Sequence, residues 1–133
     1  MAEIKIFNPD TMGKPLGPYS QITRVKASEF VFIAGQVGAS LDGKVPADFD
    51  AQCELVYANI KLALESVGAS WRNVVEFTTY MVHSQDIPKF MAYRKRAFPG
   101  FFTDGNYPPN TLLIVDRLVQ EPLLIEVQTV AAL

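Results

Sequence analysis

The chain has 133 residues, of which 49% are hydrophobic and 20% charged, and its formal net charge is -2 at pH 7. This length and composition are typical of one folded domain, which we expect to span residues 1–133, and they exclude a disordered chain. Nucleic-acid binding usually depends on a basic surface, so the slightly acidic balance argues against a nucleic-acid partner.

The sequence also indicates a compartment. Its one cysteine, Cys53, cannot form an internal disulfide, which suits a reducing environment. The N-terminus shows no leader-peptide pattern, and no stretch approaches about 18 consecutive apolar residues. We therefore expect a cytoplasmic protein with no membrane-spanning segment.

The N-terminal third of the chain is expected to be extended. Residues 3–7, 21–26 and 30–34 read as strands, and the last of these is rich in β-branched and aromatic residues. Residues 8–20 hold too many glycines and prolines for a helix.

A helix is predicted over Asp48–Val67. Its apolar residues recur at spacings of three and four, which gives one buried stripe. Asp48 is the expected N-cap, and Gly68 is expected to end the helix. A strand should follow over Asn73–Val82.

A second helix should begin near Ser84 or Asp86 and end at Pro99 and Gly100. Strands are predicted over 111–116 and 123–131, so the expected class is α+β: a six-stranded mixed sheet with two helices on one face. The other face would stay exposed unless subunits pack against it, which favours an oligomer.

Few residues are suited to nucleophilic or metal chemistry. His83, the one histidine, follows a strand in an expected loop and reads as structural. Cys53 lies on the apolar stripe of the first helix and reads as a buried structural thiol. A metal site needs several converging ligands, so no metal is expected.

Two charged residues stand out. Arg94 lies four residues after Phe90 and four before Phe98, on the apolar face of the second helix, so its guanidinium could reach a cleft or an acidic partner. Glu126 interrupts the apolar last strand. It could hold a water or move a proton, or it could simply face solvent at an edge.

Several segments in order resemble the Rid/YjgF family, also called reactive intermediate deaminases and, in older usage, L-PSP endoribonucleases. The segments cover essentially the whole chain. They are Gly17-Pro18-Tyr19-Ser20-Gln21, Phe32-Ile33-Ala34-Gly35-Gln36-Val37-Gly38, Gln52, Asn59, Gly68, Val74-Val75-Glu76-Phe77-Thr78-Thr79-Tyr80, Arg117-Leu118 and Ile125-Glu126-Val127.

The resemblance implies a chorismate-mutase-like subunit in a homotrimer with a central β-barrel, with small-molecule clefts between subunits. It implies hydrolysis of imines and enamines derived from amino acids, without a cofactor. It also implies that Glu126 assists the water, and that Tyr19 and Gly35 line the cleft.

One departure affects the expected chemistry. The family's Pro-X-Arg-Thr reads Pro108-Pro109-Asn110-Thr111 here, so Asn110 replaces the arginine that would grip the substrate carboxylate. An asparagine offers neutral donors on a short stem instead of a charged fork. Leu112, at a position often held by cysteine, makes the pocket more apolar, and Arg94 could compensate for the missing charge.

Three functions stay open from the sequence. The chain could be a deaminase-type hydrolase acting on an imine, an enamine or a related labile nitrogen compound, with Glu126 as its catalytic residue. It could instead be a non-catalytic module that binds or senses a small molecule. The third is an endoribonuclease, which the acidic charge and the single histidine argue against.

Overall fold

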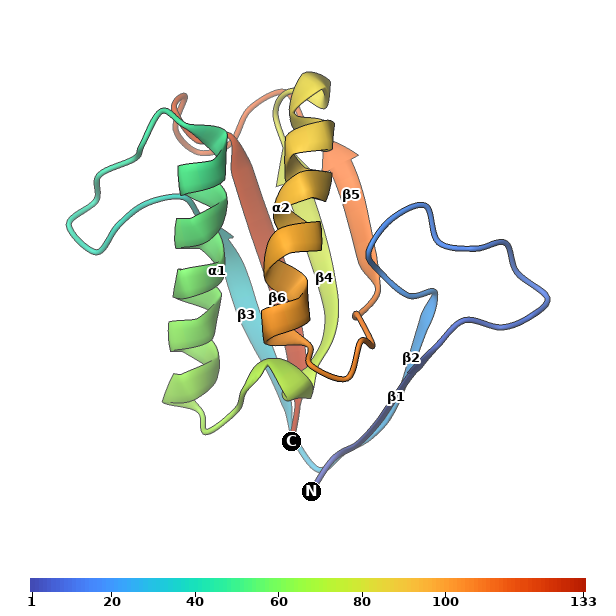
Figure 1. The fold of residues 1–133 in the computed structure, drawn as a ribbon. Coiled ribbons are helices and arrows are strands. Elements are labelled where there is room, and N and C mark those ends of the chain that lie inside the picture. Colours follow the sequence, from blue (N-terminus) through green and yellow to red (C-terminus); the bar gives the residue numbers. More distant parts are fainter.

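The computed structural model describes all 133 residues and contains the expected order of six strands and two α-helices (Figure 1). An α+β fold is therefore confirmed. The strands are β1 (Glu3–Phe7), β2 (Ile22–Lys26), β3 (Phe30–Val37), β4 (Val74–Met81), β5 (Asn110–Ile114) and β6 (Ile125–Ala132); the helices are α1 (Phe49–Ser66) and α2 (Ile87–Phe101), with short 3-10 helices η1 (Trp71–Asn73) and η2 (Ser84–Asp86).

The strands form two sheets rather than the single six-stranded sheet expected. The larger sheet has the order β3-β6-β4-β5 and is mixed, because β4 and β5 are parallel and the other pairs antiparallel. The antiparallel β1-β2 ribbon extends beside it (Figure 1). The Thr23 hydroxyl of β2 donates to the Val75 carbonyl of β4 over 2.7 Å, and no backbone ladder joins the two sheets.

Both α-helices cover the same face of the four-stranded sheet (Figure 1). The alternation predicted for β6 is confirmed, because Ile125, Val127, Thr129 and Ala131 are fully buried beneath the helices. The opposite face carries partly or fully exposed side chains, which include Phe32 of β3.

The ends of α1 follow the sequence prediction. The Asp48 carboxylate accepts a hydrogen bond of 2.9 Å from the Ala51 N–H, which satisfies one of the unpaired donors of the first turn. Gly68 adopts a φ of 74° just after the helix, a conformation that glycine reaches without steric cost.

The prediction that Pro99 and Gly100 end the second helix is wrong by one residue, since α2 continues to Phe101. Pro99 lies in the last turn and has no N–H to donate to the Lys95 carbonyl, so the helix continues past it in spite of a lost hydrogen bond. The Phe101 ring stacks on Trp71 with centroids 4.4 Å apart, and the Phe102 N–H donates to the Phe98 carbonyl over 2.8 Å. These contacts hold the final turn in place.

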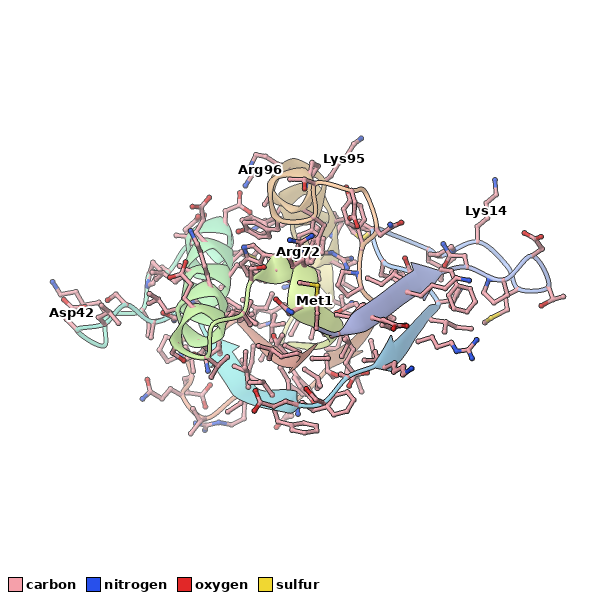
Figure 2. All side chains as sticks on the ribbon, turned by 90° about the horizontal axis from the view of Figure 1, so that it is seen from below. Met1, Lys14, Asp42, Arg72, Lys95 and Arg96 are labelled. Atoms are coloured by element: carbon pink, nitrogen blue, oxygen red, sulfur yellow. The ribbon has the colours of Figure 1, made fainter.

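The exposed charges of α2 point away from the protein. Figure 2 shows Lys95 and Arg96 projecting outward from the helix, which agrees with their exposed positions. The basic run at residues 94–96 is therefore split, because Arg94 is buried while its two neighbours are solvated.

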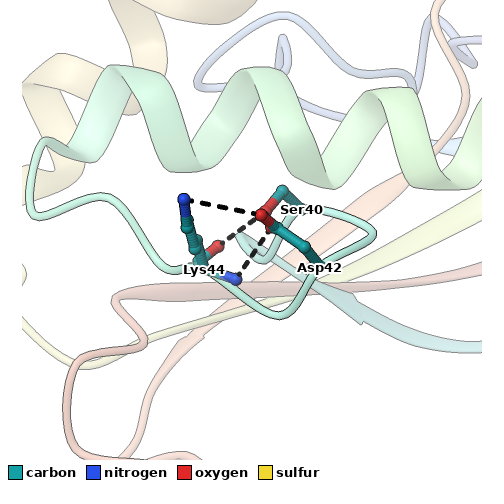
Figure 3. Close-up of polar contacts among 3 residues, drawn as sticks. All are labelled: Ser40, Asp42 and Lys44. Atoms are coloured by element: carbon teal, nitrogen blue, oxygen red, sulfur yellow. Dashed lines mark hydrogen bonds and ion pairs between the residues drawn. The ribbon is translucent and has the colours of Figure 1, made fainter.

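A tight turn closes the loop between β3 and α1. The Ser40 hydroxyl donates to the Asp42 carboxylate, and Lys44 pairs with that carboxylate at 3.6 Å (Figure 3). The hydrogen bond from Ser40 lowers the pKa of Asp42. Both contacts are local and serve the turn itself. Neither α-helix is long and apolar enough to cross a membrane.

Candidate functional site

A cavity of about 320 Å³ lies between the segment after β1, helix α2 and the edge strand β5. It brings together four residues that the sequence placed in a ligand site: Tyr19, Arg94, Asn110 and Leu112. Asn110 and Leu112 alternate with exposed residues on β5 and lie on its helix-covered face, opposite Phe77 and Thr79 of β4. The remaining lining residues are Leu16, Gly17, Ile87 and Met91.

Local hydrogen bonds orient the two neutral polar groups of the cavity. The Asn110 Oδ1 accepts from the buried Thr79 hydroxyl over 2.6 Å, which leaves the amide Nδ2 as the group that can donate to a ligand. The Tyr19 hydroxyl oxygen accepts from the Leu16 N–H over 3.1 Å, so its own proton is free to be donated.

Arg94 is the cation of the cavity, and its inward orientation was predicted from its spacing to Phe90 and Phe98. The residue is 2% exposed. Its guanidinium lies over the Phe90 ring, with Cζ 4.2 Å from the centroid, and its Nη2 meets the Met91 sulfur at 3.0 Å. Removal from water lowers the pKa of Arg94.

Glu126 and Gly35 form a second group on the opposite face of the sheet. Glu126 is half-buried on β6, where it pairs with Tyr80 of β4 and Val37 of β3. A β-bulge in β3 between Ile33 and Gln36 places Gly35 against the Glu126 side chain. The alternative that Glu126 simply faces solvent at a sheet edge is wrong, because β6 is a central strand.

Within one chain, the structure does not unite the two groups. Arg94 and Asn110 lie on the helix-covered side of the sheet, whereas Glu126 lies on the open side. A ligand in the cavity of one chain therefore does not meet the Glu126 of that chain.

The open side of the sheet is hollowed. A broad depression of about 570 Å³ lies between the β1-β2 ribbon and the sheet. Phe30 and Phe32 of β3, 49% and 75% exposed, line it together with Ile22, Val25, Val75 and Val130. Large exposed apolar surfaces of this kind usually mark an interaction site.

The sequence analysis predicted Leu112 but missed the other apolar residues that line the cavity. Ile87 and Met91 lie one turn apart on α2 and frame the guanidinium of Arg94 from the N-terminal side. Their spacing to Arg94, at seven and three residues, was a helical signal that could have identified them. Leu16 carried no such signal, because a turn-rich segment brings it to the cavity.

His83 and Cys53 lie outside both groups. His83 is exposed between β4 and α2, as expected for a loop residue. Cys53 is fully buried, and desolvation raises the pKa of its thiol, so it lacks the thiolate character of a nucleophile. No three potential ligand side chains lie together in a way that could hold a metal ion.

Comparison with known proteins agrees with the fold. The family model described as Endoribonuclease L-PSP matches residues 11–133. The chain belongs to this family, which is the Rid/YjgF family that the sequence motifs indicated.

Relatives and solved structures share the whole chain. A RutC family protein of Pyrococcus abyssi is 34% identical over 133 residues, covering 98% of each chain. The Rid-family protein YyfB of Yersinia pestis has a TM-score of 0.85 at 31% identity, with 98% of each chain covered. The structure of E. coli TdcF with bound serine has a TM-score of 0.73 at 25% identity, covering 97% of this chain and 98% of that one.

Proposed function

We propose that the chain binds a small metabolite in clefts between the subunits of a homotrimer, and that Glu126 there promotes hydrolysis of an imine, enamine or related labile C–N bond. The observation that carries this proposal is the separation of the two groups of site residues. A neighbouring copy that packs its Glu126 face beside the cavity would unite them.

The apolar open face supports the assembly. The exposed Phe30 and Phe32 would be buried if copies of the chain met across the depression beside the β1-β2 ribbon. The sheets of the subunits would then enclose a central barrel. This arrangement also explains why a charged Glu126 is retained on an open, largely apolar face.

The groups available fit a hydrolysis. The Glu126 carboxylate would take a proton from water as it attacks the C=N carbon, and the resulting amine would then leave with a proton returned by the acid. Tyr19 and Asn110 would hold the substrate from the facing subunit. E. coli TdcF, a relative with the same fold, was solved with bound serine, a small amino acid.

The assembly and the chemistry can be tested separately. Light scattering should give three times the chain mass of 14.8 kDa. Ammonia release from imines that an amino-acid oxidase generates in situ should fall by about 10²–10⁴-fold in Glu126→Gln. The matched control is Glu54→Gln, an exposed carboxylate on α1. A monomer, or unchanged rates in Glu126→Gln, would contradict the proposal.

A non-catalytic binding module is the second candidate, and Asn110 favours it. Imines of amino acids carry a carboxylate, and residue 110 offers it no charge. Asn110→Arg, run beside the wild type, separates the two functions. If only Asn110→Arg releases ammonia, the fold is competent for hydrolysis and this chain serves another ligand.

A further inference from the structure

The guanidinium of Arg94 is a buried charge without an anionic partner. Its Nε and Nη1 are shielded from solvent and donate to no acceptor in the protein. Its Nη2 meets only the Met91 sulfur, a weak acceptor. None of the four ion pairs of the protein includes Arg94.

A buried guanidinium without a partner is costly. An arginine stays protonated in proteins, so it cannot escape burial by losing its charge. The ring of Phe90 offers only a cation–π contact, which does not replace a carboxylate. Buried charges are normally paired. The unpaired guanidinium is therefore set up for a negative group that comes from outside the chain.

The cavity beside Arg94 indicates what that group is attached to. Leu16, Ile87, Met91 and Leu112 give it apolar walls, and no second cation lines it. At about 320 Å³ it suits a small ligand with one anionic group and a short apolar body.

We propose that Arg94 binds the anionic group of the ligand, and that this ligand is a small monocarboxylate with a short apolar chain. This inference rests on the cleft proposed above as the functional site. Arg94 on α2 thus supplies the positive charge that Asn110 on β5 lacks. The carboxylate is held on the α2 side of the cavity, and Asn110 is left to donate to a second polar group of the ligand.

Met91 controls access to the guanidinium. The Met91 sulfur lies 3.0 Å from the Arg94 Nη2. A Cβ at position 17 would lie 2.7 Å from the Met91 Cε, so the methionine fits there because Gly17 has no side chain. Methionine side chains change conformation easily. An incoming carboxylate displaces the thioether and takes over its contact with Arg94.

Calorimetric titration with butanoate and its neutral isostere butanamide tests the inference on the full chain. The wild type should bind butanoate about tenfold or more tightly than butanamide, as charged hydrogen bonds exceed neutral ones by that margin. Arg94→Met should lose this preference. Lys95→Met, which removes an exposed charge from the same helix, should keep it.

Equal affinities in the wild type, or a preference that survives in Arg94→Met, would overturn the inference. If Arg94→Met does not fold, Arg94→Lys takes its place, because it keeps the charge. Arg94→Lys should retain a weaker preference for butanoate over butanamide, and the loss of that preference would also count against the inference. Without ligand, Arg94→Met should melt no lower than the wild type, because it removes an unpaired buried charge. If Arg94→Met instead melts at a lower temperature and its oligomer dissociates, Arg94 pairs with a carboxylate of a neighbouring copy. That result would overturn the inference.

The inference and the proposed function fail in different ways. Butanoate binding through Arg94 without any ammonia release contradicts hydrolysis and leaves the carboxylate site standing. Ammonia release from neutral imines, with no preference for butanoate, contradicts the carboxylate site and leaves the hydrolase standing.

Discussion

The side chain of Glu126 occupies the space that a side chain at position 35 would need. A Cβ built on Gly35 would lie 2.6 Å from the Cδ of Glu126, which is closer than real Cβ contacts. The bulge in β3 brings the two residues together, so the backbone of β3 supports the carboxylate of β6. Position 35 thus determines where the proposed catalytic carboxylate lies.

Gly35→Ala should displace Glu126 and lower ammonia release by about as much as Glu126→Gln does, 10²–10⁴-fold. Binding of butanoate through Arg94 should change less than turnover, because the side chain that a Cβ at position 35 displaces is Glu126 and not Arg94. Rates and affinities measured on the same preparations check both parts. Gly13→Ala is the control, since a Cβ there meets nothing within 4 Å. Normal turnover in Gly35→Ala would contradict a positional role for this contact.

Met91→Ala should increase the preference for butanoate over butanamide. The substitution removes the thioether that a carboxylate has to displace from Arg94 Nη2, which favours butanoate. It also removes part of the apolar wall, which weakens the binding of both ligands to the same extent. The ratio of the two affinities, from calorimetry, is therefore the quantity to compare. Met12→Ala, at a 49% exposed position, is the matched control. A ratio that falls in Met91→Ala would show that the methionine assists the anion.

Gln52→Leu should destabilise the protein by about 2–4 kcal/mol, because it leaves several buried backbone groups unpaired. The fully buried Gln52 amide donates to the carbonyls of Pro46 and Pro122, both at 2.8 Å, and accepts from the Leu124 N–H at 2.8 Å. Leucine fills similar space without these bonds. Urea unfolding of Gln52→Leu beside Gln120→Leu, an exposed control, measures the difference. Equal midpoints for the two variants would be the contrary result.

The sequence predicted the features that depend on local periodicity. The two-residue alternation of β6 and the three- and four-residue spacing of α1 give buried faces wherever these segments lie, so their cores were predictable. Arg94 was placed inward for the same reason. The family motifs then led us to expect Tyr19, Asn110 and Leu112 in one ligand site, and these three residues line one cavity in the structure.

Other features depend on contacts distant in sequence, and no local pattern contains them. Phe101 stacks on Trp71, thirty positions earlier, and this contact stabilises the helical turn of α2 that follows Pro99. The bulge beside Gly35 is set by pairing with β6, and the division into two sheets depends on how β2 meets β4.

The stability of the protein should fall as pH rises above about 8.5–10, the range in which cysteine and tyrosine lose protons in an unfolded chain. Burial raises the pKa of the Cys53 thiol and of the Tyr57 and Tyr93 phenols, so the folded protein keeps these protons while the unfolded chain releases them. The unfolded state then binds fewer protons, and the free energy of unfolding decreases with pH. Urea unfolding at a series of pH values should give a shallower decrease in Cys53→Ala, whatever its stability at neutral pH. The same slope in both proteins would mean that the thiol ionises in the folded state at its ordinary pKa.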